Sequence, residues 1–164
     1  MAGILALLAD RDPLAVLEEL PGAVAEATDG LDEAALRLPE ASGKWSILQV
    51  VQHLADSDLV SGYRLRLIVA QPGSQIQGYD QDLWVRELRY DEASLADSLE
   101  QLTALRRANL RLLRSLDAAG LARSGVHSER GPESADKLMR LMAGHDLVHR
   151  RQIERIRRAI AGRA

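Results

Sequence analysis

Two histidines one helical turn apart are the residues best suited to chemistry in this sequence. His145 and His149 are four positions apart, so in an α-helix they lie on one face, one above the other. The hydrophobic period of this segment places both imidazoles on the buried stripe, where leucines would normally pack. A buried neutral imidazole needs partners for its ring nitrogens, and a buried imidazolium is costly. One cation that accepts a lone pair from each ring would satisfy both.

The spacing alone leaves a simpler alternative open. Two histidines at positions i and i+4 arise often by chance in helices. They can be polar residues at a helix interface, satisfied by water or by carboxylates. A metal site needs at least one more ligand, and the only other histidines in the chain are His53 and His127.

His53 is the best candidate for a third ligand. By the helical count it flanks the apolar stripe of an earlier helical segment, about 60° from Val50. Taken alone, it would be interpreted as a partly exposed or capping histidine. If its helix and the helix of the histidine pair are neighbours, His53, His145 and His149 can converge. Three imidazoles that leave coordination positions open are typical of a catalytic metal site rather than a closed structural one.

Other polar residues are candidates for the surroundings of such a site. His127 lies in a polar segment and is by default an exposed loop residue; alternatively it lines the mouth of the site. A ligating imidazole usually donates its second N–H to an oxygen, so nearby carboxylates and amides are candidate partners. Gln152 is alternatively a polar residue at the rim, and Asp146 points about 100° away from His145. The candidates are Asp58, Asp80, Asp146 and Gln152.

The composition is that of an ordinary soluble globular protein. The 164 residues are 46% hydrophobic and 27% charged, which suits a single domain over residues 1–164 with a sizeable core. The net charge of −3 gives no general attraction to nucleic acid or to anionic membranes. The arginines between residues 150 and 158 suit a solvated face near a helix C-terminus. We therefore expect a small-molecule substrate and no nucleic-acid partner.

Absent residue types narrow the chemistry further. The chain has no cysteine, which excludes disulfides, thiolate metal ligands and a cysteine nucleophile. Any metal must therefore bind His, Asp or Glu. No run is long enough to span a membrane, and the short apolar start lacks the basic residues of a signal peptide. We expect a cytoplasmic protein.

The elements that must position the histidines are helices. Apolar residues recur at helical spacing in four long segments, and no stretch shows the strict alternation of a strand. Capping and stop signals give the bounds of these segments. They run from Pro13 to Asp29, from Ser46 to Pro72, from Asp91 to Gly120 and from Ser134 to about Ile160.

Four long amphipathic helices in one domain make an all-α four-helix bundle the natural architecture. Residues 32–38 and 80–88 are predicted to form short helices, and residues 121–132 a polar loop. The connections over residues 71–90 and 121–132 are long enough for a crossover. A strict up-down-up-down order is therefore not assured.

Three stretches resemble one known family. The sequence GKWSILQVVQHLADSD at residues 43–58 resembles the second-helix signature of DinB-like proteins, and is most similar to the YfiT branch of metal-dependent hydrolases. The sequence IQGYDQDLW at residues 76–84 resembles the loop that follows that helix. The sequence AGHDLVHRRQI at residues 143–153 resembles the His-x-x-x-His of the fourth helix. The resemblance covers about residues 13–158.

The resemblance implies a four-helix bundle that holds a divalent metal, usually zinc or nickel, on three histidines. These map to His53, His145 and His149. It also implies a frequent homodimer, and relatives include transferases that use low-molecular-weight thiols such as bacillithiol or mycothiol. This chain departs from the pattern at Gly144, where many relatives carry an aromatic residue. We expect the glycine to leave more room, or more flexibility, beside the metal.

Three functions fit these observations. The leading hypothesis is a metal-dependent transferase whose thiol comes from outside, because the chain has no cysteine of its own. The second is a metal-dependent hydrolase of small esters or amides, with Asp80 as the candidate base and His127 at the mouth of the site. The third is a non-catalytic metal-binding bundle that acts in stress response or dimer assembly.

Overall fold

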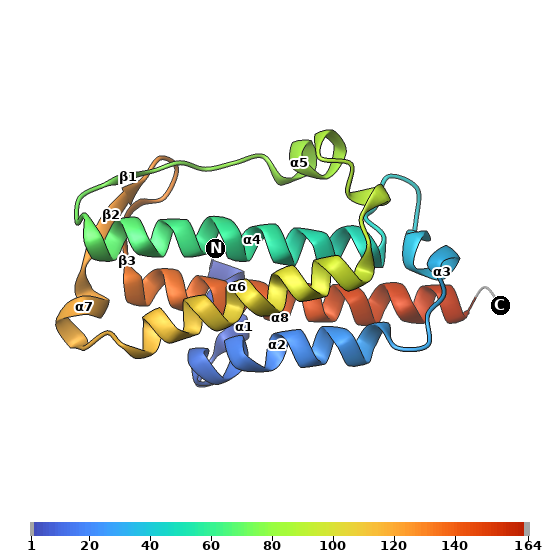
Figure 1. The fold of residues 1–164 in the computed structure, drawn as a ribbon, viewed down its shortest axis with the longest axis horizontal. Helices are drawn as coiled ribbons and strands as arrows, with labels where there is room; N and C mark the ends of the chain where they lie inside the picture. Colours follow the sequence, from blue (N-terminus) through green and yellow to red (C-terminus); the bar gives the residue numbers. More distant parts are fainter. Residues whose placement is uncertain (1, 163–164) are drawn as a thin grey trace.

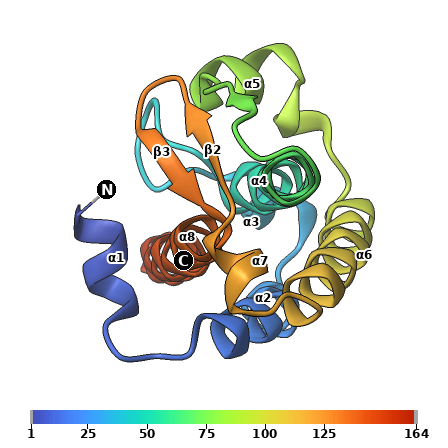
Figure 2. The same cartoon turned by 90° about the vertical axis from the view of Figure 1, so that its left-hand side faces the viewer.

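Four long helices form the body of the protein in this computed structural model, which describes residues 2–162 (Figure 1). α4 packs against both α6 and α8, and α2 packs against the same two helices, so α2 and α4 lie diagonally across the bundle (Figure 2). The predicted four-helix bundle is confirmed. Its helices are α2 (Pro13–Thr28), α4 (Ile47–Ala70), α6 (Leu95–Arg114) and α8 (Ala135–Ala161).

The helix order departs from up-down-up-down because one connection spans the length of the bundle. After α4 the chain runs back along that helix and starts α6 near the end where α4 began, so α4 and α6 run parallel (Figure 1). The diagonal step from α2 to α4 contains the short α3 (Glu33–Arg37). The long connection contains β1 (Gln75–Ile76), α5 (Gln81–Glu87) and the 3-10 helix η1 (Tyr90–Glu92).

Most helix ends follow the local signals in the sequence. The second and fourth long helices begin where expected, because Ser46 forms a capping box with Gln49 at the start of α4 and Ser134 caps α8. The expected bounds of the third long helix were wrong at both ends. Ser94, not Asp91, caps α6, which ends at Arg114, so that Gly120 lies in the separate α7 (Ala118–Ala122).

The polar loop expected over residues 121–132 is wrong for most of its length, because it contains the end of α7 and parts of two strands. β2 (Ser124–His127) pairs antiparallel with β3 (Gly131–Ser134) and parallel with β1. The sequence hides this strand because its apolar residue faces outward: Val126 is 38% exposed. Gly125 and His127 face inward instead. The pattern is therefore the reverse of the usual one, in which apolar residues of a strand face inward and polar residues face outward.

The core consists of two apolar clusters with a polar layer between them. One cluster lies at the end of the bundle that carries the sheet, and the other at the end that carries α3. The helices change from one cluster to the other around the buried polar residues Asp58, Arg106 and His149. No helix of the described chain combines the length and apolar character needed to cross a bilayer.

The first helix, α1 (Ala2–Leu8), packs against α8 at Gly144. A Cβ at position 144 would lie 2.5 Å from the carbonyl oxygen of Ile4 and 2.6 Å from its Cγ2. The expectation that Gly144 leaves room beside the histidines is therefore wrong. Its missing side chain is replaced by the backbone of α1.

Replacing Gly144 by alanine should displace α1 and lower the free energy of unfolding by about 1–3 kcal/mol, the usual cost of overpacking. Gly22→Ala is the matched control, because nothing lies within 4 Å of a Cβ built there in α2. That change should stabilise the protein by about 0.5–1 kcal/mol through helix propensity. Urea unfolding measures both. Equal stabilisation by the two substitutions would show that α1 does not occupy this contact.

Candidate metal centre

The structure brings together the imidazoles of His53, His145 and His149. The Nε2 atom of His145 lies 3.0 Å from the Nε2 of His53 and 3.0 Å from the Nε2 of His149. One ring nitrogen from each residue can be chosen so that all three lie within 4.8 Å of one another. Two nitrogens bound at about 2.1 Å to one cation, at a right angle, are about 3 Å apart. The two short contacts therefore match the spacing of ligands that share one cation.

Neighbouring helices produce this convergence. His53 comes from α4, and the other two histidines come from successive turns of α8. α4 and α8 are in contact along the bundle (Figure 2). Trp45, just before α4, lies beside the cluster, with its ring centre 4.9 Å from that of His53 and 6.3 Å from that of His149. The indole thus covers one side of the imidazoles.

Gln152 sets the tautomer of His149. The Nδ1 atom of His149 donates to the Gln152 side-chain oxygen over 2.7 Å. A neutral imidazole carries one proton, so the Nε2 of His149 presents a lone pair to the cluster. This is the second hydrogen bond that orients a ligating imidazole in known metal sites. Two roles were considered for Gln152, a partner of an imidazole or a polar residue at the rim, and the structure shows the contact with His149.

Burial keeps the cluster neutral. It lowers the pKa of His53 to about 3 and the pKa of His149 to about 4. Desolvation also lowers the pKa of His145 well below its ordinary value, although part of this side chain remains exposed. The three rings therefore present lone pairs rather than N–H⁺ groups at neutral pH, which is the form that binds metal.

Hydrogen bonds alone do not satisfy the three rings. With a lone pair on the Nε2 of His149, the 3.0 Å contact to His145 needs a proton on His145. That proton cannot also serve the equally short contact to His53 as a linear bond. If His145 instead accepts from His53, two lone pairs face each other at His149. A cation that accepts all three lone pairs removes the conflict, so the donor set fits a divalent metal.

A buried ion network lies beside the histidines. Arg106 of α6 donates to Asp58 over 2.8 Å and to both oxygens of Asp146 over 2.5 and 3.2 Å. Its guanidinium also donates to the backbone oxygen of Leu17, over 2.8 Å. Burial raises the pKa of both aspartates, to about 6 for Asp146, and Arg106 opposes that shift. The single arginine therefore connects all four long helices.

The candidate centre opens into a cavity of about 180 Å³. His145, Ser57 and Tyr79 line it, together with Ile4 of α1. The Ser57 hydroxyl lies 3.3 Å from the Nε2 of His53 and 3.1 Å from the Tyr79 hydroxyl. The long connection after α4 thus closes one side of the cavity, and a chain of two hydroxyl groups reaches the histidines.

The carboxylates expected to accept hydrogen bonds from the imidazoles bind other groups instead. Asp58 and Asp146 bind Arg106, and neither forms a hydrogen bond to a histidine. Asp80 caps α5 by accepting from the backbone N–H of Leu83 over 2.9 Å. Its neighbours Tyr79 and Gln81 line the cavity, but Asp80 does not. The expected carboxylate partners were therefore wrong for Asp58 and Asp146.

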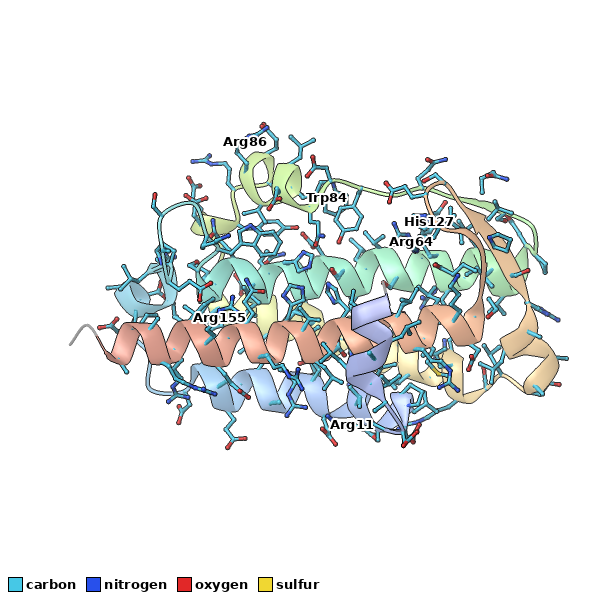
Figure 3. All side chains as sticks on the ribbon, turned by 180° about the vertical axis from the view of Figure 1, so that it is seen from behind. Arg11, Arg64, Trp84, Arg86, His127 and Arg155 are labelled. Carbon is cyan, nitrogen blue, oxygen red and sulfur yellow. The ribbon has the colours of Figure 1, made fainter. Side chains whose placement is uncertain are left out.

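His127 is not the exposed loop residue expected by default. It is 1% exposed, and its Nδ1 accepts from the backbone N–H of Glu129 over 3.1 Å. Its Nε2 is buried without a hydrogen-bond partner in the described chain. Figure 3 shows it at the hairpin, and it does not line the cavity. Its proposed role at the mouth of the site stays a prediction.

Sequence reasoning missed Arg106 and Trp45 as parts of the site. Arg106 interrupts the leucine period of α6, and a charged residue on an apolar helix face signals a buried ion pair. Trp45 lies in the stretch of residues 43–58 that carries the family resemblance, but its contact with the imidazoles was not predicted. Its indole Nε1 donates to Asp82 of α5 over 3.1 Å, a contact between distant segments that the helical pattern does not encode.

Comparison with known proteins gives a consistent family. A model described as the DinB superfamily matches residues 17–153. A Bacillus mycoides (strain KBAB4) protein named "Putative metal-dependent hydrolase" is 31% identical over 141 residues, covering 86% of this chain and 81% of that protein. A protein with the same name from Bacillus cereus (strain 03BB102) is 29% identical over 144 residues, covering 88% and 83%.

Solved structures show the same likeness. YfiT from Bacillus subtilis, described as "a probable metal-dependent hydrolase with an unusual four-helix bundle topology", matches with a TM-score of 0.83 at 28% identity, covering 89% of this chain and 84% of its own. TT2238, described as "a four-helix bundle protein", has a TM-score of 0.63 at 22% identity, covering 87% and 95%, and shows a likeness of fold alone. The predicted DinB-like resemblance is confirmed.

Replacing Arg106 by methionine should lower the free energy of unfolding by about 3–5 kcal/mol, because two buried carboxylates lose their partner. The loss should grow from pH 5 to pH 8. Without the arginine the folded-state pKa values of Asp58 and Asp146 rise further, and stability from a raised pKa is lost as pH increases. Denaturant unfolding at both pH values measures the effect. Arg107→Met, at the adjacent exposed position, is the control and should change stability little.

Proposed function

This chain belongs to the DinB superfamily, and from that premise we propose that it is a metal-dependent enzyme acting on a small molecule. A divalent cation, zinc or nickel, is held by His53, His145 and His149 in this proposal. The observation that supports it is the convergence of three neutral imidazoles. The Nε2 of His145 lies 3.0 Å from the Nε2 of each of the other two histidines. Relatives named as metal-dependent hydrolases support the same conclusion.

A divalent cation bound there would supply a Lewis acid that lowers the pKa of a thiol or a water molecule at its open positions. The chain's own residues prepare the site for it. Burial keeps the imidazoles unprotonated, and Gln152 directs the lone pair of His149 toward the centre. His145 lines the cavity, so the substrate side of the centre remains open. This open arrangement argues against a purely stabilising metal.

We propose an external low-molecular-weight thiol as the nucleophile. Hydrolysis benefits from a general base, and the three carboxylates considered for the surroundings of the site form other contacts. Asp58 and Asp146 bind Arg106, and Asp80 caps a helix. A thiol needs less help, because its pKa of about 8.5 is already close to neutral. With no cysteine in the chain, the thiol has to come from solution.

Hydrolysis of a small ester or amide is the second candidate. The names of the Bacillus relatives favour it. In that reaction the Ser57 hydroxyl, 3.3 Å from the His53 Nε2, and the Tyr79 hydroxyl beyond it would carry a proton away from a molecule held at the centre. Asp80 as the base remains a prediction in this case. A homodimer and a cytoplasmic location also remain predictions.

Metal content tests the ligand assignment directly. His53→Ala, His145→Ala and His149→Ala should each lose bound zinc or nickel, because two imidazoles hold a cation far more weakly than three. His127→Ala should keep it, since that ring lies in β2, away from the cluster. Elemental analysis of purified protein gives the stoichiometry, and circular dichroism checks the fold. One metal per chain in folded His149→Ala would overturn the assignment.

Activity assays on metal-loaded protein separate the two reactions. We expect a model electrophile, such as a halogenated aromatic compound, to be conjugated only when a small thiol is added. His145→Ala should abolish the reaction, and removing the metal with a chelator should do the same. Turnover of small esters or amides without any thiol would instead establish the hydrolase. Stoichiometric metal with neither reaction would contradict both.

A further inference from the structure

Arg64 is a buried cation in the wall of the cavity that no described carboxylate pairs with. It comes from α4 and is 8% exposed. Its guanidinium donates to the backbone oxygen of Gln77 and lies 5.7 Å from the ring centre of Tyr79. Figure 3 shows Arg64 on the side of α4 that faces the long connection. Along residues 2–162 it forms no ion pair.

The other charges of the cavity wall are matched. Arg106 binds both aspartates that line the cavity. Arg130, which also lines the cavity, forms a bidentate ion pair with Glu133, with hydrogen bonds of 2.7 and 2.8 Å. Glu129 and Glu133 act on Arg64 electrostatically, yet neither bonds to it. Arg64 is therefore the cation of this wall with unused donors.

Unused donors on a buried guanidinium point to a missing anion. A guanidinium carries five N–H donors, and here one backbone oxygen and one aromatic face are the contacts it makes. Burial lowers the pKa of Arg64, and the charge of Arg130 adds to that effect. Such a desolvated charge is costly unless it is paired. An anion entering the cavity would supply the pairing, and a planar carboxylate matches the guanidinium geometry.

We propose that Arg64 is the anion-binding residue of this cavity, and that the substrate or thiol cofactor carries a carboxylate or phosphate group. His145 lines the same cavity, so the reacting end of that molecule lies toward the histidines. Arg64 follows His53 by eleven residues of α4, so their backbones are about 16 Å apart along the helix axis. The long Arg64 side chain shortens this gap, because the ring centre of Tyr79 lies 5.7 Å from its guanidinium and the Tyr79 hydroxyl connects through Ser57 to His53. The anionic group of the molecule therefore lies at the end away from its reacting atom. The placing of the reacting end rests on the proposed function, whereas the anion contact does not.

Titration calorimetry with succinate, uncharged succinamide and inorganic phosphate tests the proposal on zinc-loaded and zinc-free protein. We expect at least one of the two anions to bind and succinamide not to bind. Arg64→Gln should weaken anion binding at least tenfold, as expected for loss of a charged hydrogen bond. Arg64→Lys keeps the charge but not the planar donors, and should have an intermediate effect. Arg86→Gln, an equal charge change at a side chain 70% exposed on α5, should leave affinity within about twofold.

The outcomes separate the two proposals. Equal weakening by Arg64→Gln and Arg86→Gln would show general electrostatics and overturn this inference, as would wild-type protein that binds neither anion. Binding of phosphate alone would support the inference and assign the group. If Arg64→Gln does not fold, unchanged affinity in Arg64→Lys would count against it. Protein that binds anions through Arg64 but never retains zinc would overturn the metal proposal only.

Discussion

Arg106 is the contact on which the arrangement of the bundle depends. It extends from α6 to Asp58 of α4, Asp146 of α8 and the backbone of Leu17 in α2. A buried guanidinium tolerates few alternative positions, because each displaced carboxylate would be left unpaired. The contact therefore fixes how the four helices align along their length. His145 precedes Asp146 in the chain, so the same alignment fixes the height of the histidines on α8.

The helix order complements this constraint. Because α4 and α6 run parallel, the connection between them has to return along the whole bundle (Figure 1). That connection brings Tyr79 over the cavity and Trp84 against Tyr79, with ring centres 4.4 Å apart. Tyr90 then anchors it by donating to Asp56 of α4 over 2.6 Å. A simple up-down bundle with short loops would leave the histidines without this cover.

The sequence predicted the helices well because their signals are local. Capping residues such as Ser46 and Ser134 act within one turn, and the spacing of His145 and His149 is fixed by the helix itself. The hairpin was not predicted. In β2 the side chain of Val126 faces outward while Gly125 and His127 face inward, so the usual alternation of buried apolar and exposed polar residues is missing. The strand instead depends on the close approach of Gly125 to Ile76, where a Cβ would lie 2.8 Å from the Ile76 Cδ1. Such a contact is invisible in a linear pattern.

Partners across helices explain the rest of what was missed. Asp58 and Asp146 were considered as partners of the imidazoles because a ligating imidazole usually donates to an oxygen. The sequence does not show which cation each carboxylate meets. Arg106 lies at least 40 positions away from either in sequence. The prediction of free space beside Gly144 was wrong for the same reason. The helix that fills this space, α1, comes from the start of the chain.

The charges of the cavity give the site a direction. Near the histidines, one arginine is shared by two carboxylates, which leaves that end able to accept a cation. At the other end, the positive charge of Arg64 is bonded to a backbone oxygen and to no carboxylate of the described residues. On the proposed function, a cation at one end and a guanidinium at the other would hold an anion in a single orientation. Because two such points of attachment cost entropy only once, orientation and affinity would come from the same pair of contacts.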